Sequence, residues 1–411
     1  MRAAGAGQIR DEALEVAAGW SGPGTPSSWR LTAGLFRAIA AHDGLRERLA
    51  HLPPDRLPAL LASAAISFLV RRDRPEPLAG YFPAPGAPQP GFDDGFFAAA
   101  WDFMTGCTDE IAALCAERRY QMNEVARCVQ IALAIGATTA ASAEPVTLVD
   151  LGTGAGLGLH LDRYRYRVGA GAFGPPTAGV RLDCELRGDR RPPPAGLPPV
   201  AERVGIDVRP VDLRDPDACA WLEACAPPEA SALSRLAAAV DVARRHPAAV
   251  VAGDAVDALP AVLADLRPGV HAGPRRPGRV VVVDAYLAVF LEPQRRASLA
   301  AILAEAGRER PVTWLSLDPL VPFGPAGRES VQGLPVPAGL ADGHRRHGVF
   351  ALLGARTFHR GTDRGRLLAR AHPSGRWIDW LSPTSSHYAP TGVGPGAMRS
   401  GWPAPRCAGQ G

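Results

Sequence analysis

The segment from residue 145 to residue 158 constrains the fold more than any other part of the chain. Residues 146–151 (VTLVDL) are apolar or β-branched around one acid, and four glycines follow at every second position: Gly152, Gly154, Gly156 and Gly158. A short apolar run bounded by turn residues is typical of a buried parallel strand. The glycines after the strand predict a tight turn into a helix. Glycine also lets the backbone approach a ligand closely, and the free N–H groups at the start of the helix would bind the polar end of a small molecule.

Spacing and composition exclude two common kinds of nucleotide site. A dinucleotide fingerprint, G-x-G-x-x-G, would need a glycine at position 157 or 159, and leucine occupies both. A P-loop needs a lysine after its last glycine, and the chain contains no lysine. Schiff-base and pyridoxal phosphate mechanisms that depend on a lysine amine are excluded for the same reason.

The remaining pattern, hydrophobic-Asp-Leu-Gly-x-Gly-x-Gly, resembles the first motif of class I S-adenosylmethionine (SAM) methyltransferases. SAM has a cationic sulfonium and an ammonium group but no pyrophosphate, so a carboxylate beside the loop suits it electrostatically. The resemblance implies that SAM contacts Asp150, Gly152, Gly154 and Gly156. A structural glycine turn in another kind of α/β protein is the alternative.

Composition and charge indicate an ordinary globular chain. Its 411 residues suffice for two domains or for one large domain with an extension. The net charge is only +4 and the arginines are scattered, so we expect no nucleic-acid partner. Seven cysteines without a C-x-x-C pair favour reduced thiols in a cytoplasmic protein. No apolar run reaches ~18 residues, so we expect no membrane anchor. His344 and His347 lack a completing acid or cysteine, so we expect no metal site.

The hydrophobic pattern divides the chain into a helical part and an α/β part. Beyond Pro145, apolar runs alternate with helical segments, which indicates a mainly parallel sheet. The predicted strands are 146–151, 180–186, 203–208, 248–252, 279–284, 312–317, 348–358 and 365–371. The last two predict an antiparallel hairpin that closes the sheet. We therefore expect a Rossmann-like methyltransferase sheet over 141–383, after an α-helical N-terminal region over 1–140 and before a flexible tail over 384–411.

The methyltransferase resemblance also implies carboxylates that hold the adenine and the ribose of SAM. Asp254 would accept a hydrogen bond from the adenine amino group, and Ala255 would offer a backbone N–H to the ring. The alternative is that Asp254 caps the helix that begins near Val256. For the ribose, Asp207 has the strand-ending Gly-hydrophobic-Asp pattern and is slightly preferred. Glu185 is the second candidate, because it lies nearer the usual separation of about 20 residues from a glycine loop.

Candidate catalytic residues lie at the end of the predicted strand 279–284. Asp284 and Tyr286 follow four valines, at the end of a strand where open α/β sheets bind their ligands. Methyl transfer gains from alignment and exclusion of water, and an oxygen or nitrogen acceptor also needs a base. We expect Asp284 to be that base, followed by Glu124 or His372, in a site shared with the polar segment around Glu124. The alternative is that Asp284 caps a helix and Tyr286 packs in the core.

The chain as a whole resembles a bacterial family of uncharacterised proteins, catalogued as a domain of unknown function with a methyltransferase-like core. Its motifs here are NEVAR at 123–127, the glycine loop, LDRYRY at 161–166, CELRG at 184–188, GID at 205–207 with PVD at 210–212, and His372-Pro373 ahead of Gly375 and Trp377. The family's loop usually reads E-x-GASAGLNL, whereas residues 150–159 read DLGTGAGLGL, which is closer to the SAM loop.

The sequence therefore predicts SAM-dependent methyl transfer to a small-molecule acceptor. Two other classes of function stay open. The first is a non-catalytic methyltransferase-like protein with a binding or regulatory role, and the second is another SAM or nucleoside reaction in the same fold.

Overall fold

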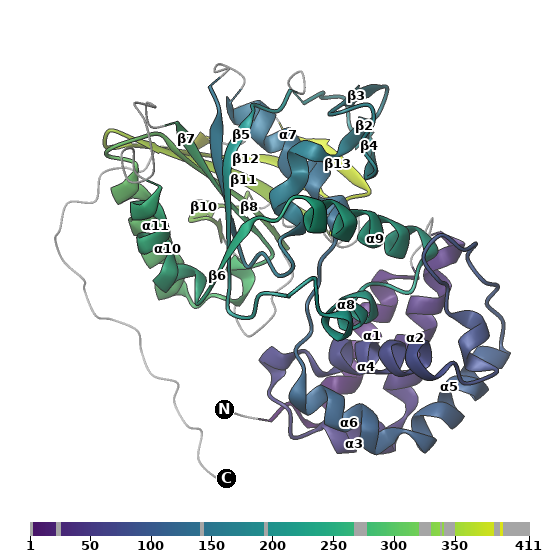
Figure 1. The fold of residues 1–411 in the computed structure, drawn as a ribbon. Coiled ribbons are helices and arrows are strands. Elements are labelled where there is room, and N and C mark those ends of the chain that lie inside the picture. Colours follow the sequence, from purple (N-terminus) through teal and green to yellow (C-terminus); the bar gives the residue numbers. More distant parts are fainter. Residues whose placement is uncertain are drawn as a thin grey trace, which may run out of the picture.

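In the computed structural model of the protein, a helical body lies beside an α/β body (Figure 1). The structure describes residues 3–21, 26–139, 144–192, 196–266, 278–319, 330–337, 339–340, 350–381 and 387–388. The tail expected over 384–411 lies outside the described residues, apart from β14 (His387–Tyr388), which pairs with the sheet.

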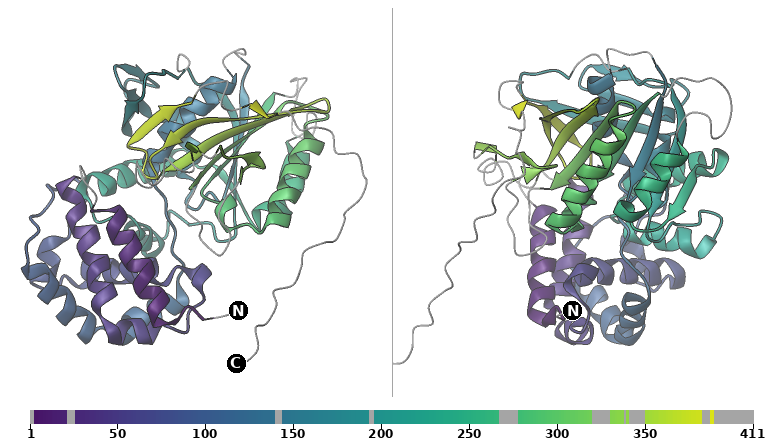
Figure 2. Two further views of the ribbon diagram at one scale, coloured as in Figure 1. Left: turned by 180° about the vertical axis from the view of Figure 1, so that it is seen from behind. Right: turned by 90° about the vertical axis from the view of Figure 1, so that its left-hand side faces the viewer.

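The helical body is arranged around one buried helix. Its helices are α1 (Gly5–Gly19), α2 (Arg30–Ala41), α3 (Asp43–Leu49), α4 (Pro58–Asp73), α5 (Gly95–Gly106) and α6 (Thr108–Glu117). Helix α4 is buried at every residue from Pro58 to Val70, as expected for a helix whose sequence is apolar all round. Helices α1, α2 and α6 pack against it, and Figure 2 shows this body from two further sides.

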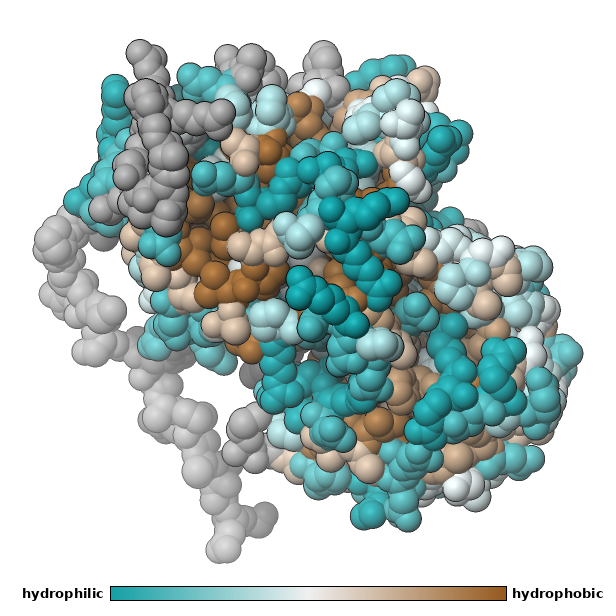
Figure 3. Space-filling model, viewed as in Figure 1, coloured by the Kyte–Doolittle hydropathy of each residue, from teal (hydrophilic) through white to brown (hydrophobic). Residues whose placement is uncertain are grey.

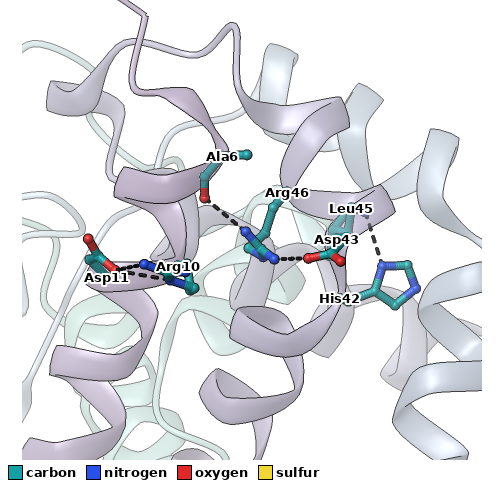
Figure 4. Close-up of polar contacts among 7 residues, drawn as sticks. All are labelled: Ala6, Arg10, Asp11, His42, Asp43, Leu45 and Arg46. Atoms are coloured by element: carbon teal, nitrogen blue, oxygen red, sulfur yellow. Dashed lines mark hydrogen bonds and ion pairs between the residues drawn. The ribbon is translucent and has the colours of Figure 1, made fainter.

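Polar contacts fix the first helices to one another (Figure 4). His42 caps α3, because its Nδ1 accepts a hydrogen bond from the Leu45 N–H at 3.0 Å. Arg46 reaches from α3 to the carbonyl of Ala6 on α1 at 3.1 Å and forms an ion pair with Asp43. The His42 contact satisfies a backbone N–H at the start of α3, which would otherwise lack a partner, and the Arg46 contact links α3 to α1.

The α/β body is built on a mixed, mostly parallel sheet. Its strand order is β3-β2-β4-β13-β12-β11-β8-β7-β1-β5-β6, and the five strands from β8 to β6 are parallel. The strands are β1 (Val146–Leu151), β2 (Arg165–Val168), β3 (Gly171–Phe173), β4 (Arg181–Arg187), β5 (Val200–Asp207), β6 (Ala249–Ala252), β7 (Arg279–Ala285), β8 (Val312–Pro319), β11 (Ala351–His359), β12 (Thr362–Ala371) and β13 (Trp377–Trp380). The short β9 (Ser330–Val331) and β10 (Leu334–Pro335) pair separately.

The structure corrects the expected end of the sheet. The predicted hairpin forms between β11 and β12, but it does not close the sheet, because β13 pairs with β12 on its outer side. Strand β4 then pairs with β13, and β2 pairs with β4. The segment that follows the glycine loop therefore crosses to the far end of the sheet, instead of returning directly to its centre.

Helices cover both faces of the central strands. They are α7 (Cys128–Thr139), α8 (Pro216–Cys225), α9 (Ala230–Arg245), α10 (Ala255–Asp265) and α11 (Pro293–Ala306). Because side chains alternate along a strand, Val281 and Val283 of β7 pack with α7 and α9, whereas Val280 and Val282 pack with α10 and α11. Helix α8 differs from the others, since its Trp221 packs into the core of the helical body.

Candidate functional site

The glycine loop after β1 has the backbone conformation that explains its sequence. Gly152, Gly154 and Gly156 have φ angles of 69°, 56° and 70°, in the left-handed region that favours glycine. The loop continues into a 3-10 helix, Leu157–Arg163.

The N–H groups of Gly154, Ala155 and Gly156 already have partners within the protein. The Gly154 N–H donates to Asp207 Oδ2 at 2.8 Å, and the Ala155 N–H donates to Asn123 Oδ1 at 3.1 Å. The N–H of Gly156 donates to the Thr153 carbonyl at 2.9 Å. The loop thus binds two side chains of the protein itself, those of Asp207 and Asn123. The polar atoms beside the loop that a ligand could contact are therefore carboxylate and amide oxygens.

A cavity of about 530 Å³ lies between the glycine loop, the ends of β1, β5 and β7, and the helical body. Strand order reverses at this point, because β1 has β5 on one side and β7 on the other, and open α/β sheets bind ligands at such a place. Strongly hydrophilic residues gather along the junction of the two bodies (Figure 3). Six residues predicted from the sequence line this cavity: Asp150, Gly152, Gly154, Asp207, Glu124 and Tyr286.

Asp150 is held under the glycine loop. Its Oδ2 accepts a hydrogen bond from the Thr153 hydroxyl at 2.7 Å. The pKa of the Asp150 carboxyl is raised to about 7, mainly by burial; the hydrogen bond from Thr153 acts against this effect, and the nearby charge of Asp207 adds to it. A Cβ on Gly158 would lie 2.9 Å from Oδ2, which explains the fourth glycine. A cation beside Asp150 would favour its ionised form.

Asp207 is the ribose candidate that the structure places at the loop. Its Oδ1 accepts the Arg209 N–H at 2.8 Å, and its Oδ2 accepts that of Gly154. Glu185 lies on β4, where it lines a separate cavity of about 490 Å³ together with Trp29. The structure therefore does not bring Glu185 to the glycine loop.

Tyr286 has a strained backbone and an unsatisfied hydroxyl. Its φ of 68° is uncommon for a residue other than glycine. The Arg127 guanidinium lies over its ring at 3.7 Å from the centroid, and Arg127 is held in turn by the Pro373 carbonyl at 2.7 Å. Burial raises the pKa of the Tyr286 hydroxyl to about 12, and within the described chain this hydroxyl has no hydrogen-bond partner. A buried polar atom without a partner at a cavity is a candidate contact for a ligand.

Glu124 lies between the two cavities and lines both. Its side chain is only 7% exposed, and Arg235 of α9 approaches it to 3.7 Å. Its Oε1 accepts the Ala126 N–H at 3.0 Å and so caps the 3-10 turn Val125–Arg127. The Glu124 carboxylate thus lies at the wall of the larger cavity with one cation and one N–H beside it.

Asp284 is fully buried in a polar pocket of its own. The Trp314 Nε1–H donates to its Oδ2 at 2.6 Å, and the Ser316 hydroxyl donates to its Oδ1 at 3.1 Å. The Ala288 N–H also donates to Oδ1, at 3.3 Å. Burial raises the pKa of the Asp284 carboxyl to about 7, and the adjacent Asp318 adds to this effect. The Asp284 carboxyl therefore has three hydrogen-bond donors around it and is a buried group whose hydrogen bonds are satisfied within the protein.

Asp284 and Glu124 do not form the shared site expected from the sequence. Side chains alternate along a strand, so Asp284 points to the same face of the sheet as Val280 and Val282, which is the face covered by α10 and α11. Glu124 precedes Val125, which packs in the cluster on the other side, and only Glu124 lines the large cavity.

Asp254 caps α10, as the alternative interpretation of its sequence proposed. Its Oδ1 accepts the N–H groups of Val256 and Asp257 at 2.8 and 3.1 Å and forms an ion pair with Arg295. None of these contacts uses Oδ2, and the side chain is 41% exposed. Asp254 and Ala255 are not among the residues that line the cavity.

His372 is placed outside both cavities. Its Nδ1 accepts the Ser374 N–H at 3.0 Å, and its ring lies 5.7 Å from that of Trp29. Burial, aided by the charge of Arg376, lowers the pKa of the His372 imidazole to about 3. An imidazole with so low a pKa is a poor base at neutral pH.

Sequence reasoning missed three arginines that line the large cavity: Arg56, Arg119 and Arg209. They come from segments far apart in the chain, and no local spacing relates them. Only the position of Arg209, two residues after Asp207, gave any signal.

The fold is that of a mixed α/β protein with a cavity where the strand order reverses. Residues 24–380 match the model of a family described as "Uncharacterized protein conserved in bacteria (DUF2332)". The chain belongs to this family, which confirms the expected membership of an uncharacterised bacterial family. No curated protein matches the chain.

Two further findings concern only the described ranges. No helix there is long and apolar enough to cross a membrane, and no group of three or more His, Cys, Asp or Glu side chains is placed to hold a metal ion. His344 and His347 lie outside these ranges.

Proposed function

We propose that this protein binds SAM in the large cavity and catalyses methyl transfer to a small-molecule acceptor. The observation that carries the proposal is the meeting of the glycine loop, Asp150 and Asp207 in one cavity at the point where the strand order reverses. The order β6-β5-β1-β7-β8 is the 3-2-1-4-5 order of doubly wound nucleotide-binding sheets, which supports a Rossmann-like core.

The residues at the cavity suit SAM better than a phosphate-bearing cofactor. The loop N–H groups are occupied, and the acids that line the cavity nearby favour a cation. Asp150 would face the ammonium or sulfonium charge, and Asp207 would accept hydrogen bonds from the ribose. The adenine would lie against exposed apolar side chains beside Asp207, namely Val208 and Phe290, which are 64% and 51% exposed.

The adenine contact of Asp254 stays part of the proposal, since its Oδ2 is outside the capping contacts. When bound, SAM supplies an electrophilic methyl group. The chain's own contribution is to align the acceptor and to exclude water, with Tyr286 donating a hydrogen bond and Glu124 receiving the acceptor proton. Asp284 and His372 do not line the cavity, so neither is proposed as the catalytic base, and we assign both a structural role.

A non-catalytic SAM-binding role is the second candidate. Three residues were predicted to act as the base, and two of them, Asp284 and His372, lie outside the cavity. This position favours the non-catalytic role. Other SAM or nucleoside reactions in the same cavity would be separated from methyl transfer by the mass of the product.

Calorimetry with SAM and with S-adenosylhomocysteine tests the proposal directly. Both are expected to bind the full chain, and Asp207→Asn is expected to weaken binding by about 1–3 kcal/mol, because one acceptor oxygen for the ribose is lost. Asp109→Asn is the matched control, since Asp109 pairs with Arg48 on the exposed surface of α6. Absence of binding by wild type at millimolar ligand would refute the proposal.

A further inference from the structure

Three arginines form a cluster on the side of the large cavity that adjoins the helical body. Arg56 ends the 3-10 turn Pro54–Arg56, Arg119 follows α6, and Arg209 follows β5. All three line the cavity, and so does Asp55, the acid next to Arg56. The glycine loop and Asp150 supply the other side, so the cavity has an acidic part at the loop and a basic part at the helical body.

The backbone around this cluster is tied together by hydrogen bonds. Arg56 Nη2 donates to the carbonyls of Cys115 and Arg118, at 2.9 and 2.5 Å, which brings the turn to the end of α6. The Trp221 Nε1–H donates to the Arg119 carbonyl at 2.9 Å.

The backbone of Arg209 is also held by the segment that follows α6. The Gln121 amide donates to the Arg209 carbonyl at 2.9 Å. Arg119 and Arg209 are thus presented from anchored backbone, although their side chains are exposed.

The charges of the cluster are not balanced within the described chain. Burial and the charges of Arg119 and Arg209 lower the pKa of the Arg56 guanidinium, and Asp55 offsets only part of this effect. No carboxylate of the described residues forms an ion pair with Arg119 or Arg209. An anion placed between the arginines would relieve this repulsion.

We propose that Arg119 and Arg209, with Arg56 beside them, bind the anionic group of the acceptor, which is therefore an amphipathic carboxylate or phosphate monoester. The guanidinium plane matches both anions with two parallel hydrogen bonds. The apolar side chains of Leu57 and Leu60 line the same part of the cavity and suit an apolar body on that acceptor. This inference rests on the proposed function, because it assigns the loop side of the cavity to SAM.

The test uses the full chain and three small probes of matched shape: benzoate, phenyl phosphate and uncharged benzamide. Calorimetry is expected to show binding of at least one anion and binding of benzamide that is at least about tenfold weaker. Arg119→Gln and Arg209→Gln should each weaken anion binding roughly ten- to hundredfold, as expected for the loss of a charge-assisted hydrogen bond. Arg37→Gln, on the exposed side of α2 and away from the cavity, should leave it unchanged. The preferred anion distinguishes a carboxylate acceptor from a phosphate acceptor.

S-adenosylhomocysteine is titrated against the same variants, so that the two proposals fail separately. If it binds wild type and benzamide binds as well as benzoate, the inference is overturned while the proposed function stands. If Arg119→Gln and Arg209→Gln weaken S-adenosylhomocysteine and leave the anions unaffected, the cluster holds the cofactor's carboxylate, and the inference is again overturned. If the anions behave as expected and S-adenosylhomocysteine does not bind, the anion site stands and the proposed function fails.

Discussion

Replacement of Asp284 by asparagine should change the pH dependence of stability and leave SAM binding intact. The pKa of this carboxyl is raised from 3.8 to about 7 in the folded protein, roughly three units, and each unit corresponds to about 1.36 kcal/mol. The folded state therefore binds more protons than the unfolded state between these values. Stability from this group is fully present below pH 3.8, and about 4 kcal/mol of it is lost as the pH rises through 7.

Asparagine does not titrate, so this loss is absent in the variant. Its amide keeps one acceptor oxygen but presents an N–H₂ in place of the other, and one hydrogen bond from Trp314 or Ser316 is lost at a cost of about 1–3 kcal/mol. We therefore expect Asp284→Asn to be less stable than wild type at pH 5 and as stable or more stable at pH 9.

Urea unfolding followed by tryptophan fluorescence at several pH values measures this difference. Only the variant minus wild-type difference is informative, because Glu12, Asp150 and Glu229 have similarly raised pKa values and give both proteins a shared pH dependence. The charge of Asp318 contributes to the raised pKa of Asp284. A stability difference that is constant from pH 5 to pH 9 would show that Asp284 is not a buried, protonatable group.

Three further predictions address the cavity. Gly154→Val should abolish S-adenosylhomocysteine binding in calorimetry, because a Cβ at φ 56° would lie 2.7 Å from Asn123 Oδ1 and displace it; unchanged affinity would contradict the cofactor site. Asp254→Ala should lower the free energy of unfolding by about 0.5–2 kcal/mol through loss of the α10 cap, and should weaken S-adenosylhomocysteine as well; a stability loss alone would exclude the adenine contact. Tyr286→Phe should change the free energy of unfolding by less than about 1 kcal/mol, since its hydroxyl has no partner in the described chain, while acceptor binding weakens; a large loss of stability would show a hidden structural bond.

The sequence was sufficient to predict the elements that depend on local pattern. The run VTLVDL and the alternate glycines predicted β1 and the tight turn after it, because both follow from side-chain size and backbone freedom. The four valines before Asp284 predicted β7 for the same reason.

What the sequence could not give was orientation and distant packing. Alternation along β7 placed Asp284 on the side of Val282, but only the fold determines which side adjoins the cavity. Glu185 had a suitable separation from the loop, yet its strand was carried to the far end of the sheet by pairing with β13. The burial of His372 against Trp29 likewise depends on residues more than 300 positions earlier in the chain.

The docking of α8 into the helical body determines how molecules can enter and leave the cavity. Trp221 is 5% exposed within that body although it belongs to the connection between β5 and β6, so a segment of the α/β body is anchored in the helical body. A hinge that swung the bodies apart would have to withdraw this side chain, at a cost of about 3–5 kcal/mol by comparison with its truncation. Exchange is therefore expected through small movements of exposed side chains at the rim, such as Val208 and Phe290, while the chamber keeps its shape.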